Sequence, residues 1–116
     1  MNKKSKQLTL TALLFLGLSM TTQAAEFWVT GTIVRTLSDG TNYGGCMISL
    51  STTVNNGCPA GGWVSLDCNG GYSRAGERSY ASALMAFSLK KSVSVLVDNT
   101  QKYNGFCVGK RIDVMN

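Results

Sequence analysis

Histidine is absent from the 116-residue chain. Without it the usual general base near neutral pH is missing, and so are Ser-His and Cys-His nucleophile pairs. Charged residues make up only 15% of the chain, and the acidic ones are scattered, so none forms the carboxylate pair of a glycoside hydrolase. Each reads as a solvated surface charge: Glu26, Asp39, Asp67, Glu77, Asp98 and Asp113. We therefore expect a protein that is not an enzyme and has no cofactor.

The chain also lacks an apolar run long enough to span a bilayer, which takes about 20 residues. Its one extended apolar segment runs from Leu8 to Met20, after three lysines within the first six residues. Small residues follow it, with an A-x-A type cleavage site after Ala24 or, as a close alternative, after Ala25. This pattern predicts a secretory signal peptide over 1–25 and a single domain over 26–116. We expect a secreted or periplasmic protein with no membrane span.

Positive charge is scarce once the signal peptide is removed. The full chain has 11 basic and 6 acidic residues, a net charge of +5. The three lysines of the signal leave 11 − 3 = 8 basic residues, so the net charge becomes 8 − 6 = +2. Nucleic-acid binding needs clustered Lys and Arg along the phosphates. We therefore expect no nucleic-acid partner.

Four cysteines lie in the predicted domain: Cys46, Cys58, Cys68 and Cys107. An even number in a small exported chain indicates two disulfides. The alternative is a metal site, but the cysteine spacings contain no C-x-x-C pair and no histidine is available. We expect disulfides and no metal, because a domain of this size has a core that is only marginally sufficient without covalent cross-links.

Alternating apolar residues and glycine-containing turns predict five short strands and one helix. We place strands at 27–36, 45–51, 63–68, 92–97 and 106–114, with a loop over 98–105. A helix is predicted over 75–91, with Tyr80, Ala83, Leu84 and Phe87 as its buried stripe and two lysines in its last turn. The order β-β-β-α-β-β is that of a mainly β, five-stranded OB-like barrel.

This topology also predicts which cysteines pair. If Leu50 lies opposite Val64 in an antiparallel pair, Cys46 faces Cys68 at a separation that a disulfide tolerates. Cys58 precedes the third strand and Cys107 begins the fifth, and parallel strands place both starts at one end of the barrel. The prediction is Cys46–Cys68 and Cys58–Cys107.

Aromatic side chains are the main candidates for binding. Trp28 and Trp63 alternate away from the predicted core, and three tyrosines lie near loops. Exposed rings stack on sugars or bases, or anchor a protein interface, whereas the alternative is that each packs beneath a loop or helix. Arg74 precedes the predicted helix and is either a ligand contact or a solvated charge. The ligand-binding candidates are Trp28, Trp63, Tyr43, Tyr72 and Arg74.

The segment from Arg78 to Val97, RSYASALMAFSLKKSVSVLV, resembles the helix and following strand of secreted bacterial toxin B subunits. The similar proteins are those of subtilase cytotoxin and the related pertussis-like and typhoid toxins. The shared features are Ala83 and Phe87 in the helix and a V-x-V strand. The stretches YGGC and WVSLDC also look like those of small exported proteins of Gram-negative bacteria.

This resemblance implies a disulfide-bonded OB barrel with a binding function. Those toxin subunits form ring-shaped homopentamers that bind cell-surface glycans and deliver a separate A subunit. We therefore expect glycan binding, a homo-oligomer and an A-subunit-like partner protein. No sugar-contacting residue of those subunits matches a position of this chain. The alternative from another class is a monomeric periplasmic or secreted module that binds a protein, such as an enzyme inhibitor.

Overall fold

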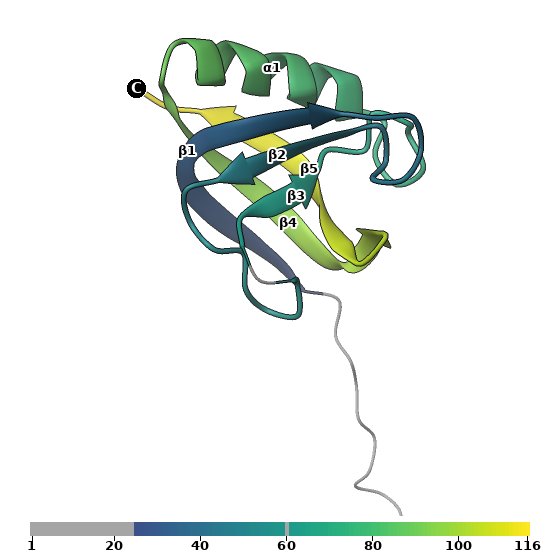
Figure 1. Cartoon of the computed structure of the whole chain (residues 1–116). Helices are drawn as coiled ribbons and strands as arrows, with labels where there is room; N and C mark the ends of the chain where they lie inside the picture. Colours follow the sequence, from purple (N-terminus) through teal and green to yellow (C-terminus); the bar gives the residue numbers. More distant parts are fainter. Residues whose placement is uncertain (1–24, 60) are drawn as a thin grey trace, which may run out of the picture.

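The structure, a computed structural model, describes residues 25–59 and 61–116. The predicted signal peptide, except for Ala25, lies outside these residues. The elements are β1 (Glu26–Ser38), β2 (Cys46–Leu50), β3 (Trp63–Ser65), α1 (Gly76–Ser88), β4 (Ser92–Tyr103) and β5 (Phe106–Val114). The strands close into a barrel in the order β1-β2-β3-β5-β4, and α1 lies across one end (Figure 1). The predicted order and the OB-like barrel are confirmed.

The long strand β1 belongs to both halves of the barrel. Its first part, Glu26 to Thr32, pairs with β4, and its second part, Ile33 to Ser38, pairs with β2. A register irregularity between Ile33 and Arg35 marks the change of partner. On the far side, parallel strands β3 and β5 meet at the single pair of Ser65 and Val108. The ring is thus held firmly through β1 and only lightly through β3 and β5.

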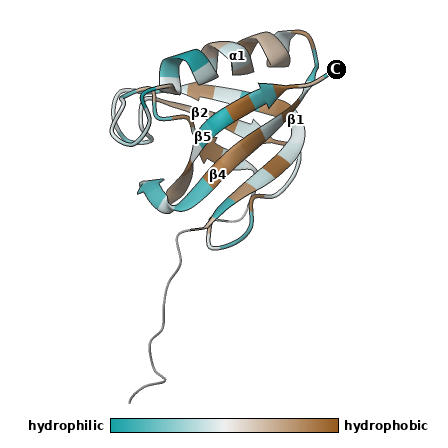
Figure 2. Cartoon of the chain, turned by 180° about the vertical axis from the view of Figure 1, so that it is seen from behind, coloured by the Kyte–Doolittle hydropathy of each residue, from teal (hydrophilic) through white to brown (hydrophobic). Residues whose placement is uncertain are grey.

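One hydrophobic core fills the barrel. Alternate residues of β4 point inward, and Val93, Val95 and Val97 have no exposed surface. They pack with side chains from every other element, including Ile48 and Val64. In the view from behind, the apolar residues of β4 follow the middle of the barrel (Figure 2). Because a single core serves all of the described elements, they make up one domain.

Small residues form the buried side of α1: Gly76, Ser79, Ala83 and Ala86. The predicted stripe was correct for Ala83 and for the partly buried Tyr80, but wrong for Leu84 and Phe87, each of which is 40% exposed. The reason is a close approach between the helix and the barrel. A Cβ at Gly76 would collide with the main chain of Asp67, so only small side chains fit at this contact.

The helix ends at Ser88, three residues before the predicted end. Lys90 adopts a left-handed conformation with φ 56°, and the Lys91 N–H donates to the Ala86 carbonyl at 2.9 Å. This turn is the usual way in which a helix stops. Lys90 and Lys91 therefore follow the last turn instead of lying in it. The α1 surface is hydrophilic at its start and apolar toward its end (Figure 2).

Both predicted disulfides, Cys46–Cys68 and Cys58–Cys107, are confirmed. The register used to derive the first was wrong by two residues, because Ile48 and not Leu50 lies opposite Val64. Strand β3 also ends early, at Ser65. Asp67 then adopts a left-handed conformation with φ 61°. Because the backbone after β3 is irregular, Cys68 lies within bonding distance of Cys46 despite the different register.

The connection between β4 and β5 is shorter than predicted. Most of the expected loop over 98–105 is strand, and β4 continues to Tyr103. The turn consists of Asn104 and Gly105, with φ of 52° and 87°. Positive φ at both positions is the geometry of a two-residue hairpin turn, for which Asn-Gly is the preferred sequence. The tight turn holds Tyr103 and Phe106 directly opposite each other.

Two disulfides indicate that the chain folds in an oxidising compartment. Over residues 25–59 and 61–116, no helix has the length and apolar character needed to cross a membrane.

Candidate functional site

An aromatic hollow lies on the outer face of the barrel where β1, β2 and β3 meet. It has a volume of about 200 Å³ and is lined by Leu37, Tyr43, Met47, Trp63 and Phe106. We call it the Trp63 hollow. Its floor comes from strands, whereas Tyr43 belongs to the β1–β2 loop and Phe106 directly follows the β4–β5 turn. Residues distant in the sequence thus build one small apolar surface.

Strand alternation explains why this hollow forms outside the core. Trp63 is partly exposed, while its neighbour Val64 is fully buried on the inner side. Met47 lies opposite Ser65, one step along the same outer face. Met47 is nevertheless only 2% exposed. The rings around it therefore act as a second, outer layer of packing over β2.

The Tyr43 ring is held in place from two sides. It meets the Phe106 ring edge to face, with centroids 5.7 Å apart. Its main-chain N–H donates to the Asp39 carboxylate at 3.2 Å, and its carbonyl accepts from the Ser65 hydroxyl at 2.7 Å. These contacts fix the β1–β2 loop against β3 and β5. A ligand entering the hollow meets a surface that is already formed.

Arg35 places a positive charge beside the Trp63 ring at the edge of this hollow. It is exposed, and its guanidinium carbon lies 5.2 Å from the centroid of the Trp63 ring. This is the geometry of a cation–π contact. None of the ion pairs among the described residues includes Arg35. The guanidinium therefore retains N–H donors for a bound group.

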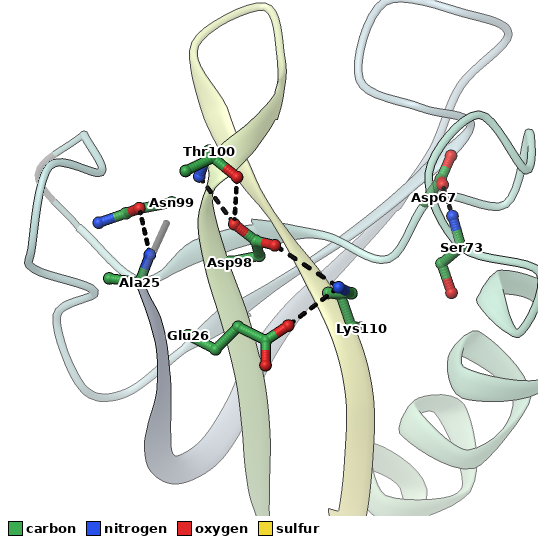
Figure 3. Close-up of polar contacts among 8 residues, drawn as sticks. All are labelled: Ala25, Glu26, Asp67, Ser73, Asp98, Asn99, Thr100 and Lys110. Atoms are coloured by element: carbon green, nitrogen blue, oxygen red, sulfur yellow. Dashed lines mark hydrogen bonds and ion pairs between the residues drawn. The ribbon is translucent and has the colours of Figure 1, made fainter. Parts of the chain in front are cut away.

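A buried carboxylate supports the loop beside this face. Asp67 has no exposed surface, so its reading as a solvated surface charge was wrong. It accepts hydrogen bonds from the N–H groups of Gly71, Tyr72 and Ser73 at 3.0, 2.6 and 2.6 Å, and from the Tyr103 hydroxyl at 2.6 Å. Figure 3 shows the contact with Ser73. Burial alone raises the pKa of Asp67, but the four donors outweigh it and lower the pKa below 3.8.

Asp98 was likewise misread as solvated. It is 4% exposed and accepts from the N–H and hydroxyl of Thr100 at 2.8 and 2.6 Å, with Lys110 Nζ at 3.5 Å (Figure 3). Burial opposes ionisation, yet these partners lower the pKa of Asp98. Asp67 thus stabilises the loop before α1, whereas Asp98 stabilises β4 locally and links it to β5 through Lys110.

Tyr103 links the Asp67 network to the aromatic face. Its ring lies against Gly44, where a Cβ would collide with it, and meets the Tyr72 ring with centroids 5.2 Å apart. Burial, and then the bond to the Asp67 carboxylate, raise the pKa of Tyr103 to about 12. Tyr103 therefore keeps its hydroxyl proton at a pH above 10, the ordinary pKa of tyrosine.

We expect stability to fall between about pH 10 and about pH 12. In this range the unfolded chain loses the Tyr103 proton while the folded chain keeps it, so the contribution present below pH 10 disappears as the pH rises. Tyr103→Phe should remove this part of the pH dependence. Urea unfolding of both proteins across the range measures it, and parallel curves would contradict the expectation.

The structure brings only some of the candidate residues together. Tyr43 and Trp63 line the same hollow, and Tyr72, which is 47% exposed, belongs to the adjacent pair with Tyr103. Trp28 lies elsewhere, on the part of β1 that pairs with β4. Arg74 lies near the start of α1 at another hollow of about 310 Å³.

Sequence reasoning missed four contributors to the site: Arg35, Leu37, Met47 and Phe106. Arg35 and Met47 gave no separate signal, because their place depends on the irregularity in β1 and on the rings that cover β2. Phe106 did have a sequence signal, because it directly follows the Asn-Gly turn at the end of the barrel.

Among the described residues, no group of three or more acidic or cysteine side chains has an arrangement that could hold a metal ion. No protein-family model, curated protein or solved structure matches this chain.

Proposed function

We propose that this protein is an exported, non-catalytic binding domain that takes a sugar ring of a cell-surface glycan into the Trp63 hollow. The observation that carries the proposal is the placement of Trp63, Tyr43 and Phe106 around one small surface hollow with Arg35 at its edge. Aromatic rings with few polar neighbours are a common way to hold a sugar, whose C–H groups pack on the ring face.

The position of the hollow in the fold supports a ligand of this class. OB barrels bind oligosaccharides and oligonucleotides on the face of the second and third strands, between the first and last interstrand loops. Met47 and Trp63 belong to these strands, and Tyr43 and Phe106 to the two loop regions. The net charge of +2 after removal of the signal peptide favours the sugar over a nucleic acid.

The size of the hollow limits what it holds. Its volume of about 200 Å³ is below the roughly 300–1,000 Å³ of sites that enclose a drug-sized ligand. One ring of a longer chain fits this description, with the rest of the glycan lying across the surface. We therefore expect weak binding at a single site.

An oligomer would raise such weak binding to a useful strength through multivalency. The resemblance to toxin B subunits supports a homo-oligomer and an A-subunit-like partner. The chain also exposes apolar residues at the end of α1 that an assembly would cover, with exposed fractions of 40% to 60%. They are Leu84, Met85, Phe87 and Leu89. Native mass spectrometry tests this part of the proposal, and a monomer at micromolar concentration would contradict it.

The binding function is tested on an array of mammalian cell-surface glycans, followed by calorimetry with the strongest hit. Trp63→Ala should weaken binding by at least about tenfold, because a central aromatic anchor contributes roughly 2 kcal/mol. Tyr43→Ala should act in the same direction.

Trp28→Ala is the matched control, because it removes the same type of ring from another face of the barrel. It should leave glycan affinity within about twofold. A chain that binds no glycan on the array, or whose binding is unaffected by Trp63→Ala, would contradict the proposal.

A further inference from the structure

The first part of β1 has hydrogen-bonding groups on only one side engaged with another strand. In an antiparallel pair, successive residues point their main-chain groups alternately toward the partner and away from it. Asn99 N–H donates to the Ala25 carbonyl at 3.1 Å, so the odd-numbered residues face β4. The carbonyls of Thr30 and Thr32 accept from Thr52 Oγ1 at 2.7 Å and Ser51 N–H at 2.8 Å, so the even-numbered residues face away.

The hydrogen bonds from Ser51 and Thr52 reach the outward main-chain groups of Thr30 and Thr32 but not those of Trp28. Pairing with β2 begins only at Ile33. Among the described residues, no hydrogen bond reaches the outward main-chain groups of Glu26 or Trp28. A short length of strand edge therefore displays N–H and C=O groups that repeat every second residue, about 7 Å apart.

A hollow of about 210 Å³ runs beside this edge. One wall is the strand itself, from Phe27 to Thr30, and the opposite wall is the β2–β3 loop. The loop contributes side chains that both donate and accept hydrogen bonds: Thr52, Thr53, Asn55 and Asn56. Trp28 also lines the hollow and is 48% exposed, and its ring lies 5.5 Å from the guanidinium carbon of Arg111 on β5. The space thus combines a free strand edge with polar groups across from it.

Both walls are fixed in position. The loop is tied to β4 by Asn99 Nδ2 donating to the Asn56 carbonyl at 2.8 Å and by Lys102 Nζ donating to the Gly57 carbonyl at 3.0 Å. The strand is tied by Lys110 Nζ, which lies 2.9 Å from the Glu26 carboxylate (Figure 3). These contacts use side chains and the β4 side of β1. They leave the outward main-chain groups available.

We infer that this edge of β1 is a second binding site, which takes an extended segment of another protein as an added strand. An extended polypeptide main chain presents donors and acceptors with the same two-residue repeat as Glu26 and Trp28, so it matches this edge along its length. Strand addition to an exposed edge is an established mode of peptide recognition, in which side-chain contacts set the specificity. The threonine and asparagine side chains of the β2–β3 loop supply those contacts here.

The inference is tested with a phage-displayed library of random linear peptides, selected against the protein as it exists after signal removal. The strongest peptide is then synthesised with N-methyl groups on alternate amides, in two sets. One set should lower affinity by about tenfold or more, because it removes hydrogen bonds to the edge. The other set, which faces away, should change affinity by less than about twofold.

Variants of Trp28 provide the matched pair on the protein side. Trp28→Pro removes the outward N–H at an edge position, which tolerates proline, whereas Trp28→Ala keeps the N–H and loses the same ring. Trp28→Pro should bind at least about tenfold more weakly than Trp28→Ala. If Trp28→Pro does not fold, the two peptide sets and the amide shift at Trp28 in the original chain still decide.

Three results would overturn the inference: no selected peptide, equal effects of the two N-methyl sets, or amide shifts at the Trp63 hollow instead of β1. A self-associated chain that Trp28→Pro converts to monomers would also overturn it, because a second copy would then occupy the edge. Trp63→Ala should retain the peptide affinity. The experiments can therefore refute the peptide site without refuting the proposed glycan site, and the reverse.

Discussion

Replacing Cys58 and Cys107 together with alanine is expected to lower the free energy of unfolding by about 4 kcal/mol. The two residues are 49 positions apart, so the bond closes a long loop in the unfolded chain and removes much of its conformational entropy. The bond also ties the β2–β3 loop to β5 next to Phe106. We therefore expect the double variant to lose glycan affinity as well.

The matched control is the double variant Cys46→Ala with Cys68→Ala. Its separation is 22 residues, which gives an expected loss of about 3 kcal/mol by the same relation. Urea unfolding of the two double variants and of the original chain measures both effects. A loss below about 1 kcal/mol for Cys58 and Cys107 would show that loop closure does not stabilise this barrel.

Replacing Asp67 with asparagine is expected to lower the free energy of unfolding by about 3 kcal/mol. Four donors converge on this fully buried carboxylate. Asparagine has nearly the same shape and tolerates the left-handed backbone at this position. Its amide NH₂, however, would face main-chain N–H groups and leave buried donors without an acceptor. For a domain of this size, such a loss lowers the melting temperature by roughly 10–20 °C.

The control for Asp67→Asn is Asp113→Asn. Asp113 pairs with Arg111 at 2.8 Å on the surface, and breaking an exposed pair of this kind costs at most about 1 kcal/mol. Because the pKa of Asp67 is lowered in the fold, its contribution is present above about pH 3.8 and is lost as the pH falls through the folded value. Asp67→Asn should therefore flatten the acid side of the stability curve. Equal losses for the two variants would contradict the role of the network.

The barrel was predictable from the sequence because strand alternation and glycine-containing turns are local signals. The disulfide pairing followed from topology, since parallel strands place Cys58 and Cys107 at one end in any register near the true one. The surfaces of α1 were less predictable. Leu84 and Phe87 fit a buried stripe by spacing, but Gly76 allows the helix so close to the barrel that small residues take that side.

The site was only partly predictable for a related reason. Exposure of Trp63 and Trp28 followed from alternation along their strands. The grouping of Tyr43 with Phe106 depends on two loops that meet across the barrel, which no local pattern reports. Asp67 was read as a surface charge because three of its donors are the main-chain N–H groups of Gly71, Tyr72 and Ser73. Nearly every residue has a main-chain N–H group, so the sequence does not mark these donors.

The pairing of β1 with β4 has a consequence for the time course of folding. Glu26 lies opposite Asp98, and every pair of this ladder joins residues at least 60 positions apart. Such non-local pairing is slow, on the order of milliseconds to seconds. During synthesis β1 therefore cannot pair with its main partner, β4, until most of the chain has left the ribosome. The barrel can form only after most of the chain has been synthesised. Until then β1 lacks its main partner strand, and the chain stays unfolded, which is the state that a protein-export channel accepts.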